Sequence, residues 1–125
     1  MRLNRLFQRL TRLMFRGEVW LASLDPTIGV EIRKTRPVVI MSRSGIGVLP
    51  LKVIVPITDW KDAYRPRVWM IRLDPNEGNG LEKVSAADAF QVRSIAQVRL
   101  IRKLGVLSEI EMDPIAEALS IVLDI

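Results

Sequence analysis

Short apolar segments separated by turns are the feature that most limits how this chain can fold. Residues 17–24, 37–41, 51–58, 67–73 and 99–107 are each predicted strands, and further short candidates lie around Ser85, Phe90, Val92 and Ile95. Pro37 is placed at the first residue of its strand, where a missing N–H is tolerated. Many short strands joined by Gly- and Pro-containing turns, such as 78–80, are typical of a small, curled, mostly antiparallel barrel.

The C-terminal segment predicts one α-helix. Ser108 and Glu111 have the spacing of a capping box, in which the Ser hydroxyl accepts a backbone N–H and the Glu reaches back to the cap residue. We expect the helix to run to about Leu123. Its predicted buried stripe is Ile110, Ile115, Ala118, Leu119 and Val122. The fold class is therefore mainly β with a C-terminal α-helix.

Residues 1–15 predict an extra basic amphipathic helix before the domain formed by residues 16–125. Its apolar positions are Leu3, Leu6, Phe7, Leu10, Leu13 and Met14, and Arg2, Arg5, Arg9 and Arg12 recur at the same spacing. Such a helix fits a membrane-surface anchor or a partner-binding segment. A packing extension, or an upstream start codon with Met14 as the usual start, explains the pattern as well, and we favour these over membrane contact.

The composition excludes several classes of site. Cys and His are both absent, so disulfides, thiolate metal sites, cysteine nucleophiles and histidine bases are ruled out. We expect no metal and no cofactor. No apolar run is long enough for a bilayer span or a secretory signal, and the lack of Cys suits a cytoplasmic protein. The net charge is +5, and without the four arginines of residues 1–15 it is +1, so the body is nearly neutral.

Two strand ends carry side chains suited to binding an anion. Pro37 restricts the backbone of Arg36, and a guanidinium held in this way can donate two hydrogen bonds to a phosphate or carboxylate. Thr58 ends the third strand, where its hydroxyl can donate to a phosphoryl oxygen. From the residues alone we favour structural roles for both: Arg36 pairs with Glu31 or caps the end of the barrel, and Thr58 satisfies a turn.

The aromatic residues offer one candidate for stacking on a nucleobase. Trp20 and Trp69 lie in strand patterns and are expected in the core or at an interface. Trp60 lies in a polar loop and is the better candidate for stacking.

Several segments, taken in order, resemble the MazF/PemK family of toxin endoribonucleases. The matching segments are residues 16–20 (RGEVW), 25–31 (DPTIGVE), 34–42 (KTRPVVIMS), 53–58 (VIVPIT), 80–85 (GLEKVS), 91–95 (QVRSI), 99–100 (RL) and 104–108 (LGVLS). Each segment alone is weak evidence for the family, but the ordered set covers about 110 residues and is specific to it.

The resemblance implies an SH3-like barrel and a homodimer that cleaves single-stranded RNA at short sequences without a metal. It also implies a type II toxin, held by a cognate antitoxin whose acidic, flexible tail blocks the RNA groove. Arg36, Thr58 and Glu31 match the family's catalytic arginine, catalytic threonine and acidic loop residue. Positions that contact RNA in relatives correspond to Ser85, Gln91 and Arg99. The predicted basic groove on this body comprises Arg33, Lys34, Arg36, Arg65 and Arg67.

The expected reaction uses the RNA's own 2′-OH as nucleophile. Attack on the adjacent phosphorus gives a 2′,3′-cyclic phosphate and a 5′-OH, with Glu31 as the first candidate base and Arg36 and Thr58 as donors to the developing charge. An alternative is a gyrase-inhibiting toxin of the CcdB type, which shares the barrel and lacks nuclease activity. A non-catalytic SH3-like peptide-binding module is a weaker alternative, because only 6% of the residues are aromatic.

Overall fold

The computed structural model describes residues 14–32, 34–44 and 49–125. The helix predicted within residues 1–15 lies outside these ranges except for Met14 and Phe15. Arg33 of the predicted basic groove also lies outside the described residues.

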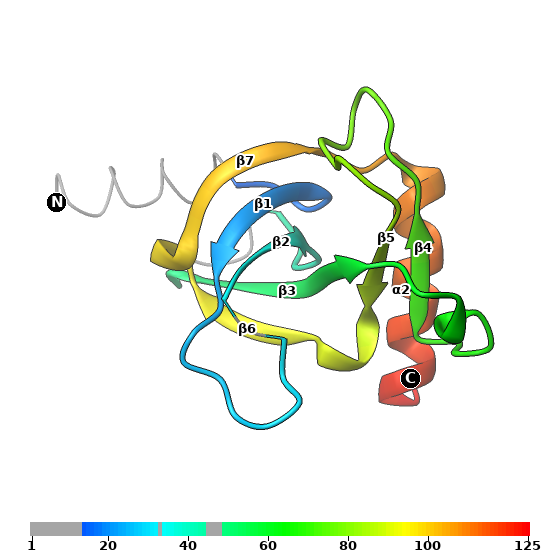
Figure 1. The fold of residues 1–125 in the computed structure, drawn as a ribbon. Coiled ribbons are helices and arrows are strands. Elements are labelled where there is room, and N and C mark those ends of the chain that lie inside the picture. The colour runs from blue at the N-terminus through cyan, green and yellow to red at the C-terminus, as the bar shows by residue number, and fades with distance from the viewer. Residues whose placement is uncertain (1–13, 33, 45–48) are drawn as a thin grey trace, which may run out of the picture.

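Seven strands and one α-helix make up the described chain (Figure 1). They are β1 (Glu18–Ser23), β2 (Thr35–Ile40), β3 (Leu51–Asp59), β4 (Met70–Leu73), β5 (Ser85–Asp88), β6 (Arg93–Ala96), β7 (Leu100–Val106) and α2 (Glu109–Leu123). Three 3₁₀ turns join them: η1 (Asp62–Tyr64), η2 (Ala89–Gln91) and η3 (Gln97–Arg99). The sheet order is β4-β5-β3-β2-β1-β7, with β6 also paired to β3, and the paired strands are antiparallel. This confirms the predicted small antiparallel barrel with a C-terminal helix.

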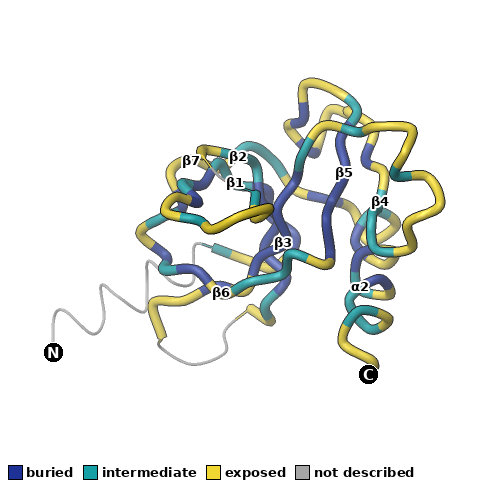
Figure 2. The backbone as a smooth tube through the Cα atoms, turned by 60° about the horizontal axis from the view of Figure 1, so that its bottom comes forward, coloured by how far each residue is buried: buried dark blue, intermediate teal, exposed yellow. Residues whose placement is uncertain are grey.

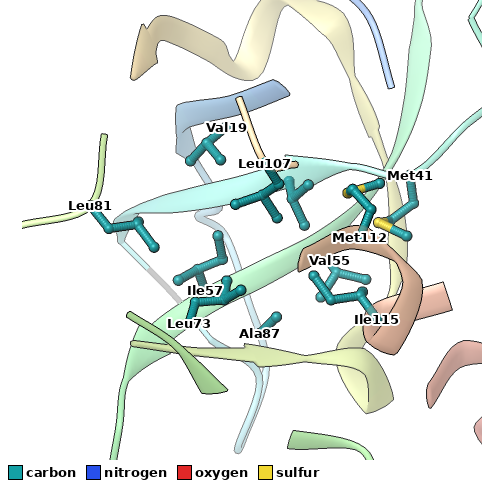
Figure 3. Close-up of a cluster of buried hydrophobic side chains, with 11 residues drawn as sticks. Val19, Met41, Val55, Ile57, Leu73, Leu81, Ala87, Leu107, Met112 and Ile115 are labelled. Atoms are coloured by element: carbon teal, nitrogen blue, oxygen red, sulfur yellow. The ribbon is translucent and has the colours of Figure 1, made fainter. Parts of the chain in front are cut away.

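The long strand β3 organises the sheet. Its first half pairs with β6, its second half pairs with β5, and β2 lies along its other edge. Because side chains alternate between the two faces of a strand, Val39 and Val55 enter one core while Val38 and Ile54 enter another. The first core lies between the sheet and α2 and includes Met112 (Figure 3).

The connection from β4 to β5 packs against β7 and helps to close the barrel. Gly78 O accepts a hydrogen bond of 2.8 Å from Val106 N. A Cβ on Gly80 would lie 2.1 Å from Leu104 O, and one on Gly105 would lie 2.4 Å from Asn79 C. Only glycine fits at these two positions. The segment predicted as a simple turn is therefore also a barrel contact.

Helix α2 begins with the predicted capping box. Ser108 Oγ accepts from Glu111 N at 3.2 Å, and Glu111 Oε1 accepts from Ser108 N at 2.9 Å. The predicted burial of Ile110 is wrong, because its side chain is 85% exposed. Met112, Ile115 and Ala118 are the buried residues, and a stripe of helical period that passes through Met112 does not pass through Ile110.

Two further predictions were wrong. Pro37 lies inside β2, opposite Leu21, because the strand begins at Thr35. The position is tolerated because the ladder with β3 begins only at Val38. Phe90 lies in the 3₁₀ turn η2 rather than in a strand, since Asp88 accepts its backbone N–H and starts the turn.

Candidate active site

Strands β2 and β3 bring Arg36 and Thr58 together. Val38 pairs with Pro56, so the same register extended by two residues places Arg36 opposite Thr58. Both line one cavity of about 310 Å³, which we call the Arg36 cavity. Its other lining residues are Leu21, Thr35, Pro37, Ile57, Asp59, Gly80, Leu81, Glu82, Lys83, Ser85, Arg102 and Leu104.

The Arg36 guanidinium has hydrogen-bonding capacity that the described residues do not use. Its Nε is buried and has no hydrogen-bond partner within the described part of the chain. An unpaired buried donor costs about 1–3 kcal/mol. The cavity also holds Lys83 and Arg102, although Lys83 Nζ lies 3.1 Å from Asp59 Oδ2. An anion with several acceptor oxygens fits this set of donors.

A second cavity of about 530 Å³ adjoins the first at Thr58, which lines both. We call it the aromatic cavity, because Tyr64, Trp69 and Phe90 line it. Its remaining lining residues are Val30, Glu31, Ile32, Arg67, Met70, Asp88 and Gln91. Arg36 and Glu31 therefore face different cavities, with Thr58 common to both.

Glu31 is held by its own loop, between β1 and β2. Its Oε1 accepts from Ile28 N at 2.9 Å, and its Oε2 lies 3.9 Å from Arg93 Nη1. Gln91 ties the same loop to η2, since its Oε1 accepts from Ile32 N at 2.6 Å. The carboxylate of Glu31 is about half exposed, which leaves it accessible from the aromatic cavity.

Asp88 is a carboxyl in the aromatic cavity that the sequence did not single out. Its residue is 4% exposed, and burial raises the pKa of its carboxyl against hydrogen bonds from Phe90 and Gln91 that lower it. An acidic residue at the end of a short segment otherwise made of Ser and Ala was the only signal. A buried carboxyl with a raised pKa in the same cavity as Thr58 is suited to proton transfer.

Comparison with known proteins assigns the family. The model of the PemK-like, MazF-like toxins of type II toxin-antitoxin systems matches residues 15–123. This chain belongs to that family.

Named relatives of this PemK/MazF-like chain cover most of its length. It is 35% identical over 122 residues to Endoribonuclease MazF9 of Mycobacterium tuberculosis, spanning 90% of this chain and 98% of that protein. It is 39% identical over 83 residues to Endoribonuclease PemK of Escherichia coli, spanning 66% of this chain and 60% of that protein.

Solved structures of toxins share the fold. The Mycobacterium tuberculosis toxin MazF-mt6 matches with a TM-score of 0.69 at 26% identity, covering 86% of this chain and 97% of that chain. MazF from Deinococcus radiodurans matches with a TM-score of 0.74 at 19% identity, covering 89% and 96%. A mycobacterial endoribonuclease in complex with its cognate antitoxin matches at 0.69 and 20% identity, covering 89% and 95%.

Of the other predicted site residues of this PemK/MazF-like protein, Ser85 and Arg99 make internal hydrogen bonds. Ser85 lines the Arg36 cavity, but its Oγ donates to Lys83 O at 2.8 Å. Arg99 Nη1 donates to the carbonyls of Ser23 and Asp25, which fixes the start of the β1–β2 loop. Trp60 lines neither of the two cavities described above. The RNA contacts assigned to these residues stay predictions.

The described residues of this PemK/MazF-like chain contain neither a candidate metal cluster nor a membrane-spanning helix. Among them, no group of three or more acidic side chains is arranged to hold a metal ion. Within the same residues, no helix is both long and apolar enough to cross a membrane.

Proposed function

We propose that this chain is the toxin of a type II toxin-antitoxin system and acts as a sequence-specific, metal-independent endoribonuclease on single-stranded RNA. The observation that carries the proposal is the unpaired, buried Nε of Arg36 in a cavity shared with Thr58. Cleavage of a phosphodiester requires a site that binds its phosphate, and this cavity offers such a site on a barrel of the family. Residues 16–125 form the proposed nuclease domain.

The proposed reaction begins with the ribose 2′-OH of the substrate. It attacks the adjacent phosphorus in line, the bond to the 5′ oxygen breaks, and the products are a 2′,3′-cyclic phosphate and a 5′-OH. Charge grows on the non-bridging oxygens, to which Arg36 and Thr58 donate hydrogen bonds. Donors already aimed at such charge contribute about 3–4 kcal/mol each to the rate.

The proton acceptor lies on the other side of Thr58. Glu31 is our first candidate, since its carboxylate is accessible and lines the aromatic cavity. Asp88 is the second, because it lines the same cavity and its pKa is raised by burial. The leaving 5′ oxygen takes up a proton, and Arg36 is the candidate donor.

Primer extension on a long defined RNA treated with the purified protein tests activity, strand preference and cleavage site together. We expect discrete stops within single-stranded regions and an unchanged rate in chelator. An RNA with 2′-deoxyribose at the scissile nucleotide should resist cleavage. Cleavage of that RNA would refute attack by the 2′-OH, and a rate that only one divalent metal restores would refute metal independence.

Variants at the two donors test the site itself. Thr58→Val keeps the shape and removes the hydroxyl, so kcat should fall about 100-fold, while Thr58→Ser should keep most activity. Arg36→Ala should abolish cleavage and leave the unfolding transition in place. Unchanged cleavage by either Thr58→Val or Arg36→Ala would move the active site elsewhere.

An antitoxin with an acidic, flexible tail is the proposed protein partner. The support is the family, the antitoxin complex of a structural relative, and the cationic lining from Arg36, Lys83 and Arg102. Binding should weaken as salt rises, because screening reduces attraction between the tail and this lining. Calorimetry at several salt concentrations measures this. A homodimer is also proposed, and sedimentation velocity tests it.

A further inference from the structure

The most exposed aromatic side chain on the wall of a cavity is an unexplained feature of the described surface. Phe90 is 63% exposed and lines the aromatic cavity together with Tyr64 and Trp69. These three are nearly half of the chain's aromatic residues, which comprise three Trp, one Tyr and three Phe. An apolar ring held in water beside a cleft is typical of a binding surface.

Phe90 sits on a backbone that is fixed before any ligand arrives. Asp88 Oδ1 accepts Phe90 N at 3.1 Å, and Trp69 O accepts the neighbouring Ala89 N at 2.9 Å. The rings of Phe90 and Trp69 meet edge to face, with centroids 5.8 Å apart and planes at 68°. Figure 2 shows the fully buried strand β5 that carries this turn. A platform fixed in this way loses little conformational entropy when it binds a flat ligand.

The position of the cavity points to a nucleobase. Thr58 lines both the aromatic cavity and the Arg36 cavity, so a chain whose phosphate lies at Arg36 would reach the aromatic cavity by passing Thr58. Its volume of about 530 Å³ is ample for one base and its ribose. Arg67, 5.3 Å from the centre of the Tyr64 ring, adds positive charge that a nucleotide favours.

We propose that the aromatic cavity is a nucleobase subsite, in which Phe90 stacks on the base next to the scissile phosphate. This inference rests on the proposed function and adds the place where the substrate's sequence is read. A base stacked on Phe90 would present its π-face to the ring and its edge to polar lining residues such as Asp88 and Gln91.

Trp60 is less suited to this role than Phe90. The Trp60 and Tyr64 rings meet edge to face, with centroids 5.9 Å apart and planes at 85°, and the Arg72 guanidinium lies 5.7 Å from the centre of the Trp60 ring. The Trp60 ring therefore already has two neighbours. A base would have to displace these neighbours, whereas Phe90 already presents an exposed ring.

The test combines substitutions in the protein with changes in the RNA, as in a double-mutant cycle. Primer extension first identifies the cleavage site, and short RNAs around it are then made with 2′-deoxyribose at the scissile nucleotide, so that they bind without being cut. One flanking base at a time is removed to leave an abasic site. Fluorescence anisotropy then gives the Kd of each RNA for wild type and for Phe90→Ala.

We expect one flanking position at which base removal weakens binding to wild type about 5- to 150-fold, the range for stacking one base. Phe90→Ala should weaken binding to the intact RNA by a similar factor and should be insensitive to base removal at that position. Phe90→Trp should restore both properties, and Phe90→Leu, which lacks a π-face, should not.

The matched control is Phe15→Ala, which removes a ring that is 46% exposed and lies outside both cavities. It should bind every RNA as wild type does, and urea unfolding should show that Phe90→Ala is folded. Equal binding of all RNAs by Phe90→Ala and wild type would overturn the subsite while leaving the nuclease intact. Loss of self-association or antitoxin binding alone would overturn it in favour of a protein interface. Failure of wild type to cut any RNA would instead refute the proposed function.

Discussion

Asn79 is a fully buried polar side chain whose loss should destabilise the fold strongly. Its Nδ2 donates to Asp74 O at 2.8 Å and to Glu111 Oε2 at 2.9 Å. Its Oδ1 accepts from Asn76 N at 3.2 Å and from Leu81 N at 3.1 Å. One amide thus uses both donors and both acceptor positions, and it joins the β4–β5 connection to the first turn of α2.

The size of the effect follows from which partners Asn79→Ala leaves unpaired. The hydrogen bond to Leu81 N is buried, and the one to Asp74 O is part-buried. Each buried group left without a partner costs about 1–3 kcal/mol, and water can reach the second. We therefore expect Asn79→Ala to lower the free energy of unfolding by about 2–4 kcal/mol, a large part of the total for a domain of this size.

Urea unfolding followed by tryptophan fluorescence measures this change. The matched control is Asn76→Ala in the same connection. Asn76 Oδ1 accepts from Gly78 N and Asn79 N, but the residue is exposed and water can replace its amide, so only about 1 kcal/mol should be lost. Asn79→Asp should be worse than Asn79→Ala, because it sets a second carboxylate against Glu111. The reasoning would be refuted if Asn79→Ala stayed within about 0.5 kcal/mol of wild type, or if Asn76→Ala cost as much.

Three further perturbations test other parts of the structure. Burial raises the pKa of the Glu111 carboxyl, but hydrogen bonds from Ser108, Asn79 and Asn76 outweigh it and hold the pKa below its ordinary 4.5. The unfolded state then binds the proton more readily, so the free energy of unfolding should fall as the pH drops below about 4.5. The fall should be less steep in Glu111→Gln. Acid titrations in which the free energy of unfolding of both proteins falls with the same slope would contradict this. Gly80→Ala should cost at least about 2 kcal/mol, because its Cβ meets the Leu104 backbone, whereas Gly29→Ala at a similar positive φ has open space and should cost about 1 kcal/mol in thermal unfolding. If Asp88 accepts the 2′-OH proton, the cleavage rate should fall with decreasing pH around a value above the ordinary aspartate pKa of 3.8, and this fall should vanish in Asp88→Asn. Loss of the same fall in Glu31→Gln would assign it to Glu31.

The fold was predictable wherever a local pattern determines it. The alternating strands and the Ser108–Glu111 capping box depend on near neighbours in the chain, and the structure confirms both. Ile110 was misplaced because its apolar character was given more weight than the helical period of Ile115 and Ala118, which passes through Met112 instead. The role of Asn79 was not predictable because one of its partners, Glu111, lies on α2, and only the folded chain brings the two side chains together.

The candidate site was also predictable from the sequence only in part. Arg36 and Thr58 were recognised one by one as side chains at strand ends, but their meeting was not predictable, because it depends on the register between β2 and β3. The division between two cavities was not predictable either, since it depends on where the β1–β2 loop lies against η2. Phe90 was read as part of a strand, and its exposure appears only once Asp88 caps the 3₁₀ turn.

The internal contacts of Gln91 and Arg99 change how variants at these positions should be interpreted. Gln91 accepts the Ile32 N–H, and Arg99 donates to the carbonyls of Ser23 and Asp25, so both hold the loop that carries Glu31. Loss of cleavage in a variant of either residue is therefore no proof of RNA contact, because a displaced Glu31 would lower the rate as well. The two explanations differ in binding: a lost contact weakens affinity for an uncleavable RNA, whereas a displaced proton acceptor lowers kcat and leaves that affinity unchanged.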